Sequence, residues 1–346
     1  MSTYFIAMGA AALIAYFGAR FLSPYFLKWG LVDVPHTQAR KVHATKIPFT
    51  GGATIVCAIA CVMLAGAVVV PEMIPLLAPQ KWTALIFGAS VLFVCGAVDD
   101  TFGLPPKFQI IGPLLAASAV VFSGIQVTKI TNPFFQGSVI SFASIALLAP
   151  LITFFWLMMI MYGTKLLDGL DGLATGVSTI AAIMIFCLTQ TIKFYEPTVG
   201  FFALVCAGAC LGFLVHNFYP ARAFLGEGGS LFLGFIIGVL AILSGSKIAT
   251  TLLVMGLPLF DVVRVMIVRR ILGQPIFVGD QLHLHYLLMR NGLSHRAAVL
   301  VYYVIAASFG VTALLFQSRG KLVMLGILFL SALVLTTVLH VRVKKI

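Results

Sequence analysis

Long apolar runs separated by short polar gaps constrain this chain more than any other feature of its sequence. Hydrophobic residues make up 61% of the 346 positions, and charged residues make up only 9%. A soluble domain is about 45–50% apolar and about 25% charged. Lipid rather than water must therefore cover most of the folded surface. We expect a single integral membrane domain over residues 1–346, with no separate soluble domain.

The apolar runs have the length of membrane spans. A transmembrane helix needs about 20 mostly apolar residues, and the sequence predicts an all-α polytopic fold with about 11 such helices. They cover residues 3–22, 50–70, 83–98, 108–124, 143–162, 174–192, 197–216, 229–244, 248–268, 297–316 and 322–340. Residues 125–142 alternate in part and contain a turn signal at Asn132-Pro133, which predicts a small hairpin outside the membrane.

The charges predict an orientation. Assigning the gaps alternately to two sides places most of the 22 Lys and Arg residues on one side. By the positive-inside rule that side is cytoplasmic, so we expect the N-terminus outside and the C-terminus in the cytoplasm. Topology and anionic lipid also account for the net charge of +12, so we expect no nucleic-acid partner.

The acidic residues follow the same division. Most of the ten Asp and Glu residues fall on the predicted cytoplasmic side. Carboxylates are costly near a bilayer and are rarely kept there without a task, and they contribute little to topology. The pattern therefore predicts an acidic cluster on this face, of the kind that holds a divalent metal and a phosphate substrate.

Two acidic motifs carry the clearest chemical pattern. Asp99 and Asp100 end the third apolar segment, and Lys107 opens the fourth. Adjacent carboxylates repel unless a cation is near; Mg²⁺ takes oxygen ligands together with substrate phosphates, and a lysine offers a point charge for phosphate. Asp168-Gly-Leu-Asp171-Gly puts two carboxylates on one face of a helix, beside glycines that let backbone approach a ligand. A polar helix end and an ordinary acidic turn are the alternatives.

Three further polar segments lie on the same predicted side. Residues 226–230, Gly-Glu-Gly-Gly-Ser, are typical of an anion site at a helix N-terminus or of a flexible loop with a serine N-cap. His283 and His285 offer imidazoles for phosphate contacts or proton transfer, and indicate zinc only weakly because no Cys is near. In the first loop, basic residues that include Arg40 and His43 either enforce topology or bind an anionic nucleotide or lipid head group.

Together these residues resemble the polyprenyl-phosphate N-acetylhexosamine-1-phosphate transferase family, glycosyltransferase family 4. Members of this family move a sugar phosphate from a UDP-sugar to a membrane polyprenyl phosphate. The resemblance runs along nearly the whole chain, in the family's order. Its motifs are Arg40-Lys41-Val-His43 with Pro48 and Gly51-Gly52, Asp99-Asp100 with Lys107, Asp168-Gly-Leu-Asp171-Gly-Leu-Ala, Asn217-Phe-Tyr-Pro220-Ala221, Gly226-Glu-Gly-Gly-Ser230, Pro258-Leu-Phe-Asp261, and Asp280 with His283-Leu-His285.

The resemblance implies a cytoplasmic cleft in a bacterial inner membrane, where a polyprenyl phosphate oxygen attacks the β-phosphorus of a UDP-sugar and UMP leaves. It implies Mg²⁺, or Mn²⁺ in its place, as cofactor. Expected partners are the UDP-sugar, the polyprenyl phosphate lipid and the membrane, with a homodimer left open. The residues expected to act are catalytic Asp99, Asp100, Asp168 and Asp171; metal-binding Glu227 and Asp171; and substrate-binding Arg40, His43, Lys107, Lys165, Asn217, His283 and His285.

The segment that contains His283 and His285, called the histidine segment below, resembles that of the branch that starts O-antigen, enterobacterial common antigen or teichoic acid with N-acetylglucosamine 1-phosphate. The muramoyl-pentapeptide branch typically carries three consecutive histidines followed by Phe-Glu, which this chain lacks, and it is the nearer alternative. A transporter or ion channel is a remote alternative, because the acids lie mainly at the segment ends rather than in mid-span.

The chain departs from the family pattern at four positions. The family usually has Asn at Lys165 and Asp at Glu227, and the branch often has Arg at Gln281 and His at Tyr286. A charged lysine cannot ligate a cation. We therefore expect Lys165 to contact the pyrophosphate or to pair with an acid, while Glu227 reaches the metal. A family member that has lost catalysis is the alternative.

Overall fold

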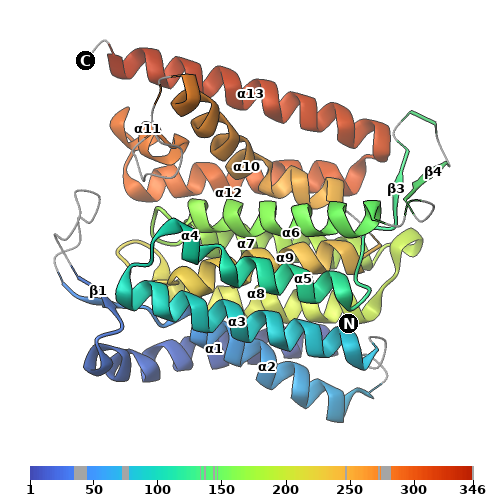
Figure 1. Ribbon diagram of the computed structural model, residues 1–346, viewed down its shortest axis with the longest axis horizontal. Helices are drawn as coiled ribbons and strands as arrows, with labels where there is room; N and C mark the ends of the chain where they lie inside the picture. The colour runs from blue at the N-terminus through green and yellow to red at the C-terminus, as the bar shows by residue number, and fades with distance from the viewer. Residues whose placement is uncertain are drawn as a thin grey trace.

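The described part of the chain is almost entirely helical (Figure 1). The computed structural model describes residues 1–34, 45–71, 78–132, 134–135, 138–142, 145, 147–245, 248–271, 273 and 282–344. The longer helices are α1 (Ser2–Trp29), α2 (Gly51–Val69), α3 (Pro79–Phe102), α5 (Ile111–Phe122), α6 (Leu148–Leu167), α7 (Leu173–Thr189), α8 (Pro197–Asn217), α9 (Glu227–Leu243), α10 (Ile248–Ile271), α12 (His295–Leu315) and α13 (Ser318–Lys344).

Each predicted apolar segment overlaps one of these helices. Among the described residues, eight helices are long and apolar enough to cross a membrane, and three apolar stretches, 106–122, 173–189 and 227–243, are shorter. The prediction of an all-α polytopic membrane protein is confirmed. The remaining elements are short: α4 (Pro106–Gln109), η2 (Ile192–Phe194), α11 (Leu284–Arg290), β1 (Val32–Asp33), β2 (Ile47–Pro48), β3 (Lys129–Thr131) and β4 (Val139–Ser141).

The hairpin predicted within residues 125–142 is present. Strands β3 and β4 pair antiparallel, with Ile130 opposite Ile140. The Asn132 side-chain oxygen accepts a hydrogen bond from the backbone N–H of Phe134 at 2.9 Å. This is the local bond by which asparagine favours turns, and it explains why the turn could be predicted from the sequence.

Small residues bring the central helices into backbone contact. A Cβ added at Gly212 of α8 would lie 2.0 Å from the backbone oxygen of Ala12 in α1. A Cβ added at Gly96 of α3 would lie 2.1 Å from the Cα of Gly228 in α9. Helices in membranes associate largely through such close packing, because lipid tails are as apolar as the side chains. These glycines therefore set the positions of α8 and α9 within the bundle.

The long helices run side by side, so their connections gather at two ends (Figure 1). One end, at the left of Figure 1, carries β1, α4, α11 and the C-terminus. The other end carries the N-terminus and the β3–β4 hairpin. The gaps that hold the acidic motifs thus belong to one end of the bundle, which we call the polar end.

Candidate active site

The acidic side chains lie at or next to helix ends at the polar end of the bundle. Asp99 and Asp100 lie in the last turn of α3, Asp168 follows α6, Asp171 lies in the turn before α7, and Glu227 begins α9. Asp168 lies within electrostatic reach of both Glu227 and Asp171, and Asp100 within reach of Glu227 and Asp168. Residues that are more than 100 positions apart in the sequence therefore form one acidic cluster.

Asp100 binds the N-terminus of α9. Both of its carboxylate oxygens accept the backbone N–H of Glu227, at 3.0 Å each. The positive end of the helix dipole favours a carboxylate at this position. Gly226 makes the contact feasible, because its φ of +77° suits glycine and a Cβ there would lie 2.7 Å from Asp100 Oδ2. The expected anion site at this helix start is thus occupied by a carboxylate of the chain itself.

Asp99 stabilises the turn after α3. Its Oδ1 accepts the backbone N–H of Leu104 at 2.7 Å and the amide of Gln109 at 3.2 Å. Lys107, expected to contact phosphate, is exposed, and its ammonium lies 5.1 Å from the centre of the Phe108 ring. The structure therefore does not pair Lys107 with the acids, and its contact with a phosphate stays a prediction.

Lys165 joins the acidic cluster directly. Its ammonium forms an ion pair with Glu227 Oε1 and donates a hydrogen bond to Gln109 Oε1 at 2.8 Å. Of the two contacts expected for Lys165, the structure shows the pairing with an acid. Sequence reasoning missed Gln109, which connects Lys165 to Asp99; its only signal was a polar residue at the start of an apolar segment.

Asp168 and Asp171 sit at the centre of this arrangement. Protein packed around the half-buried carboxyl of Asp168, with Glu227 and Asp171 nearby, raises its pKa to about 8. Burial and neighbouring like charges both disfavour an ionised carboxyl. A cation would relieve that repulsion. Asp171 accepts the backbone N–H of Ala221 at 3.0 Å. This bond connects the turn from Asp168 to Asp171, called the acidic turn below, to the segment after α8.

Asn217 organises that same segment. It is 2% exposed; its side-chain oxygen accepts the hydroxyl of Thr175 at 2.8 Å, and its side-chain nitrogen donates to the backbone oxygen of Ala223 at 3.0 Å. These contacts bind the connection between α8 and α9 to α7. Substrate binding by Asn217 stays a prediction.

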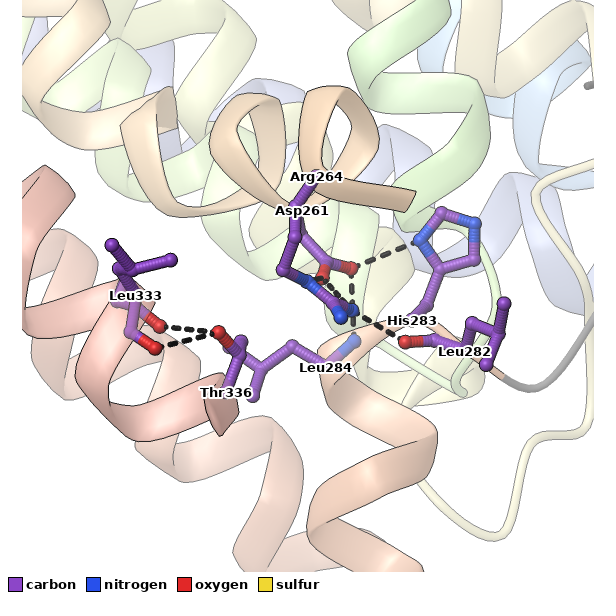
Figure 2. A network of polar contacts seen from close by, with 8 residues as sticks. Asp261, Arg264, Leu282, His283, Leu284, Leu333 and Thr336 are labelled. Carbon is purple, nitrogen blue, oxygen red and sulfur yellow. Dashed lines mark hydrogen bonds and ion pairs between the residues drawn. The ribbon is translucent and has the colours of Figure 1, made fainter. Parts of the chain in front are cut away.

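The two predicted histidines occupy different environments. His283 Nδ1 lies 2.9 Å from a carboxylate oxygen of Asp261 in α10 (Figure 2). His285 is buried, its ring is parallel to that of His283 at 5.6 Å, and its Nε2 has no hydrogen-bond partner among the described residues. Burial, with His283 adding to the effect, lowers the pKa of His285 to about 3. His285 is therefore neutral near pH 7, and its phosphate contact stays a prediction.

The histidine segment packs on the acidic turn. A Cβ added at Gly169 would lie 2.6 Å from His285 Nε2, and the Tyr286 hydroxyl donates to the backbone oxygen of Gly169 at 3.4 Å. The glycine between the two aspartates thus gives room to an imidazole. Five other residues of the predicted family motifs, Arg40, Lys41, His43, Asp280 and Gln281, lie outside the described residues.

The donor atoms of the cluster suit a hard cation. In the described part of the chain, no three His, Cys, Asp or Glu side chains already form a metal site. Mg²⁺ does not require one, because it usually binds through one or two carboxylates plus substrate phosphates. Asp168 and Asp171 offer such oxygens, and Glu227 offers one that Lys165 now shares. The residues therefore fit a cation that arrives with phosphate ligands of its own.

The fold and the cluster define a class: a polytopic helical membrane protein with carboxylates, a lysine and histidines gathered at one end of its bundle. Comparison with known proteins identifies the family. The sequence profile of Glycosyl transferase family 4 matches residues 82–245. With the relatives described next, this match shows that the chain belongs to glycosyl transferase family 4, as its motifs predicted.

Several relatives match nearly the whole chain. A protein of Bacillus subtilis (strain 168), named probable undecaprenyl-phosphate N-acetylglucosaminyl 1-phosphate transferase, is 33% identical over 88% of this chain and 82% of its own length. A decaprenyl-phosphate N-acetylglucosaminephosphotransferase of Mycolicibacterium smegmatis is 28% identical over 95% of this chain and 86% of its own length. A phospho-N-acetylmuramoyl-pentapeptide-transferase of Moorella thermoacetica is 38% identical, but over only 41% of this chain and 44% of its own length.

Proposed function

We propose that this protein transfers an N-acetylhexosamine 1-phosphate, in the first instance N-acetylglucosamine 1-phosphate, from a UDP-sugar to a polyprenyl phosphate. A phosphate oxygen of the lipid forms a bond to the β-phosphorus of the UDP-sugar, the bond between that phosphorus and the bridging oxygen breaks, and UMP leaves. The observation that carries the proposal is the match to N-acetylglucosamine phosphotransferases over 88% and 95% of the chain. The muramoyl-pentapeptide relative matches 41%.

In this proposal the chain's own residues act by charge and position. Phosphoryl transfer needs little covalent chemistry from a protein, so positioning and charge neutralisation supply most of the catalysis. Asp99, with Asp100 beside it, faces the acceptor phosphate, which is largely ionised near pH 7 and needs no strong base. Lys107, Lys165 and His283 contact phosphate oxygens, with further contacts from Arg40, His43, Asn217 and His285.

We also propose Mg²⁺ as the cofactor, with Mn²⁺ as a substitute. Asp171, Asp168 and Glu227 would hold it, with Asp171 and Glu227 as the leading ligands. When bound with the donor, the ion supplies positive charge to the pyrophosphate. The surroundings of Asp168 support this proposal, because burial first, and then the charges of Glu227 and Asp171, raise the pKa of its carboxyl to about 8, and a nearby cation would favour the ionised form.

The polar end is proposed to face the cytoplasm from a bacterial inner membrane. The gaps at this end carry most of the 22 Lys and Arg residues, which the positive-inside rule places in the cytoplasm. UDP-sugars would then reach the site from the cytoplasm, and the lipid would reach it from the membrane.

A panel of donors tests the proposal. Purified protein, undecaprenyl phosphate and Mg²⁺ are incubated with UDP-N-acetylglucosamine, UDP-N-acetylgalactosamine and UDP-N-acetylmuramoyl-pentapeptide, and UMP and the lipid product are measured. We expect UMP and a lipid-linked product from UDP-N-acetylglucosamine, and loss of most UMP release in Asp99→Asn and Glu227→Gln. Near-wild-type turnover by both variants would refute these roles. A folded wild-type protein that releases no UMP from any donor would favour an inactive family member.

A further inference from the structure

A buried carboxylate on α10 organises the start of the histidine segment (Figure 2). Asp261 is 2% exposed. Its Oδ2 receives the backbone N–H of Leu284 at 2.9 Å and lies 2.9 Å from His283 Nδ1. Its Oδ1 receives two N–H groups of Arg264, at 2.8 and 3.2 Å. Both oxygens of Asp261 are therefore used.

The arrangement fixes backbone as well as side chains. Arg264 also donates to the backbone oxygen of Leu282, so α10 holds three consecutive residues at the start of α11. A buried carboxylate is costly unless charged and polar partners compensate it. Arg264 supplies the charge. The guanidinium of Arg264 and the backbone N–H of Leu284 would be enough to compensate the buried carboxylate of Asp261. Its additional contact with the imidazole of His283 therefore indicates that Asp261 also serves that ring.

The imidazole contact decides which nitrogen of His283 faces a ligand. An ionised carboxylate only accepts hydrogen bonds, so Nδ1 of His283 must donate to Asp261. Nε2 is then the nitrogen left to meet a ligand, and the side chain of His283 keeps 14% of its exposure.

The ring is held beside the acidic turn. His285 lies parallel to His283 at 5.6 Å, and His285 in turn packs against Gly169, between Asp168 and Asp171. The α10 network therefore presents His283 next to the residues proposed to receive the nucleotide pyrophosphate.

We propose that Asp261 is a positioning residue that holds the ring of His283 with Nδ1–H directed at Asp261, in the orientation in which Nε2 faces the UDP-sugar. This inference rests on the proposed function and deepens it, because it assigns the α10–α11 network to the donor rather than to the lipid acceptor. Asp261 touches neither substrate.

Asp261→Asn tests the proposal. Asparagine keeps the size of the side chain but removes its charge and one acceptor. We expect kcat/KM for the UDP-sugar to fall about tenfold or more, the scale seen when a partner that orients a functional histidine is removed, while KM for polyprenyl phosphate stays unchanged. In a His283→Gln background, Asp261→Asn should cause no further loss, because its effect passes through the ring.

Two controls separate positioning from folding. Thr336→Val removes a buried hydroxyl in the same region, which donates to the backbone oxygens of Ala332 and Leu333 (Figure 2). It should leave kcat/KM for the UDP-sugar and KM for polyprenyl phosphate unchanged. If Asp261→Asn does not fold, His283→Gln keeps the Asp261–Arg264 pair and should show the same donor-selective defect.

Equal losses for donor and acceptor, additive losses in the double variant, or wild-type kinetics in Asp261→Asn would each overturn the inference while leaving the proposed function intact. Unchanged kinetics in the single variant His283→Gln would also overturn the inference and leave the proposed function intact. A wild-type protein that transfers no sugar phosphate would instead refute the proposed function.

Discussion

The ion pair between Lys165 and Glu227 makes a quantitative prediction. Lys165 lies where the family usually has Asn, and its ammonium compensates a carboxylate that we propose as a metal ligand. Replacing Lys165 with Asn removes that compensation and leaves Glu227 among Asp100 and Asp168. The variant should therefore be less stable without a divalent cation, and should respond to Mg²⁺ more strongly than the wild type.

The magnitude follows from burial. Removing one partner of a buried ion pair costs about 3–5 kcal/mol. The two side chains keep 16% and 17% of their exposure, so water screens part of the charge, and we expect about 2–3 kcal/mol. A cation at 100 times its Kd that binds only the folded protein restores about 2.7 kcal/mol. In the wild type the cation must compete with the Lys165 ammonium for Glu227, so the wild type gains less from Mg²⁺, and excess Mg²⁺ should close most of the difference.

Thermal unfolding of detergent-purified protein, in EDTA and in excess Mg²⁺, measures both effects. Lys165→Asn should melt well below the wild type in EDTA and close to it in Mg²⁺, and its UMP release should saturate at lower Mg²⁺. Lys165→Arg keeps the charge and is the matched control, which should follow the wild type. Equal melting in EDTA, or an Mg²⁺ dependence identical to that of the wild type, would refute the reasoning.

The remaining predictions concern glycines. Gly169→Ala should reduce UMP release severalfold with little change in melting, because its Cβ would lie 2.6 Å from His285 Nε2 and displace the histidine segment; a wild-type rate would contradict that packing. Gly96→Ala should lower the melting temperature sharply, because its Cβ would lie 2.1 Å from the Cα of Gly228. Gly9→Ala, where a Cβ meets nothing within 4 Å, is the control and should melt like the wild type.

The helices could be predicted from the sequence because an apolar run of membrane-spanning length has few other folds open to it. The hairpin could be predicted because the asparagine at its turn makes a local bond. Both features depend on residues that are neighbours in the sequence, and the membrane restricts the choices further.

The contacts within the site could not be predicted in the same way. Lys165 contacts Glu227 and Gln109, which are 62 and 56 positions away in the sequence. No local sequence pattern predicts a contact over such a separation. Asp261 was visible only as part of a motif, because its role depends on α10 lying beside the start of α11. Gly228 was interpreted as part of a ligand loop, whereas the structure uses it for helix packing.

The most direct test of the central claim follows the β-phosphorus of the donor. UDP-N-acetylglucosamine labelled with radioactive phosphorus at the β-position is incubated with the protein, undecaprenyl phosphate and Mg²⁺, and the label is measured in the lipid and aqueous phases. Transfer of a sugar phosphate predicts that the label enters the lipid in equal amount to the UMP released. Label that remains in the aqueous phase as UDP while sugar enters the lipid would contradict the account, because the protein would then transfer the sugar alone.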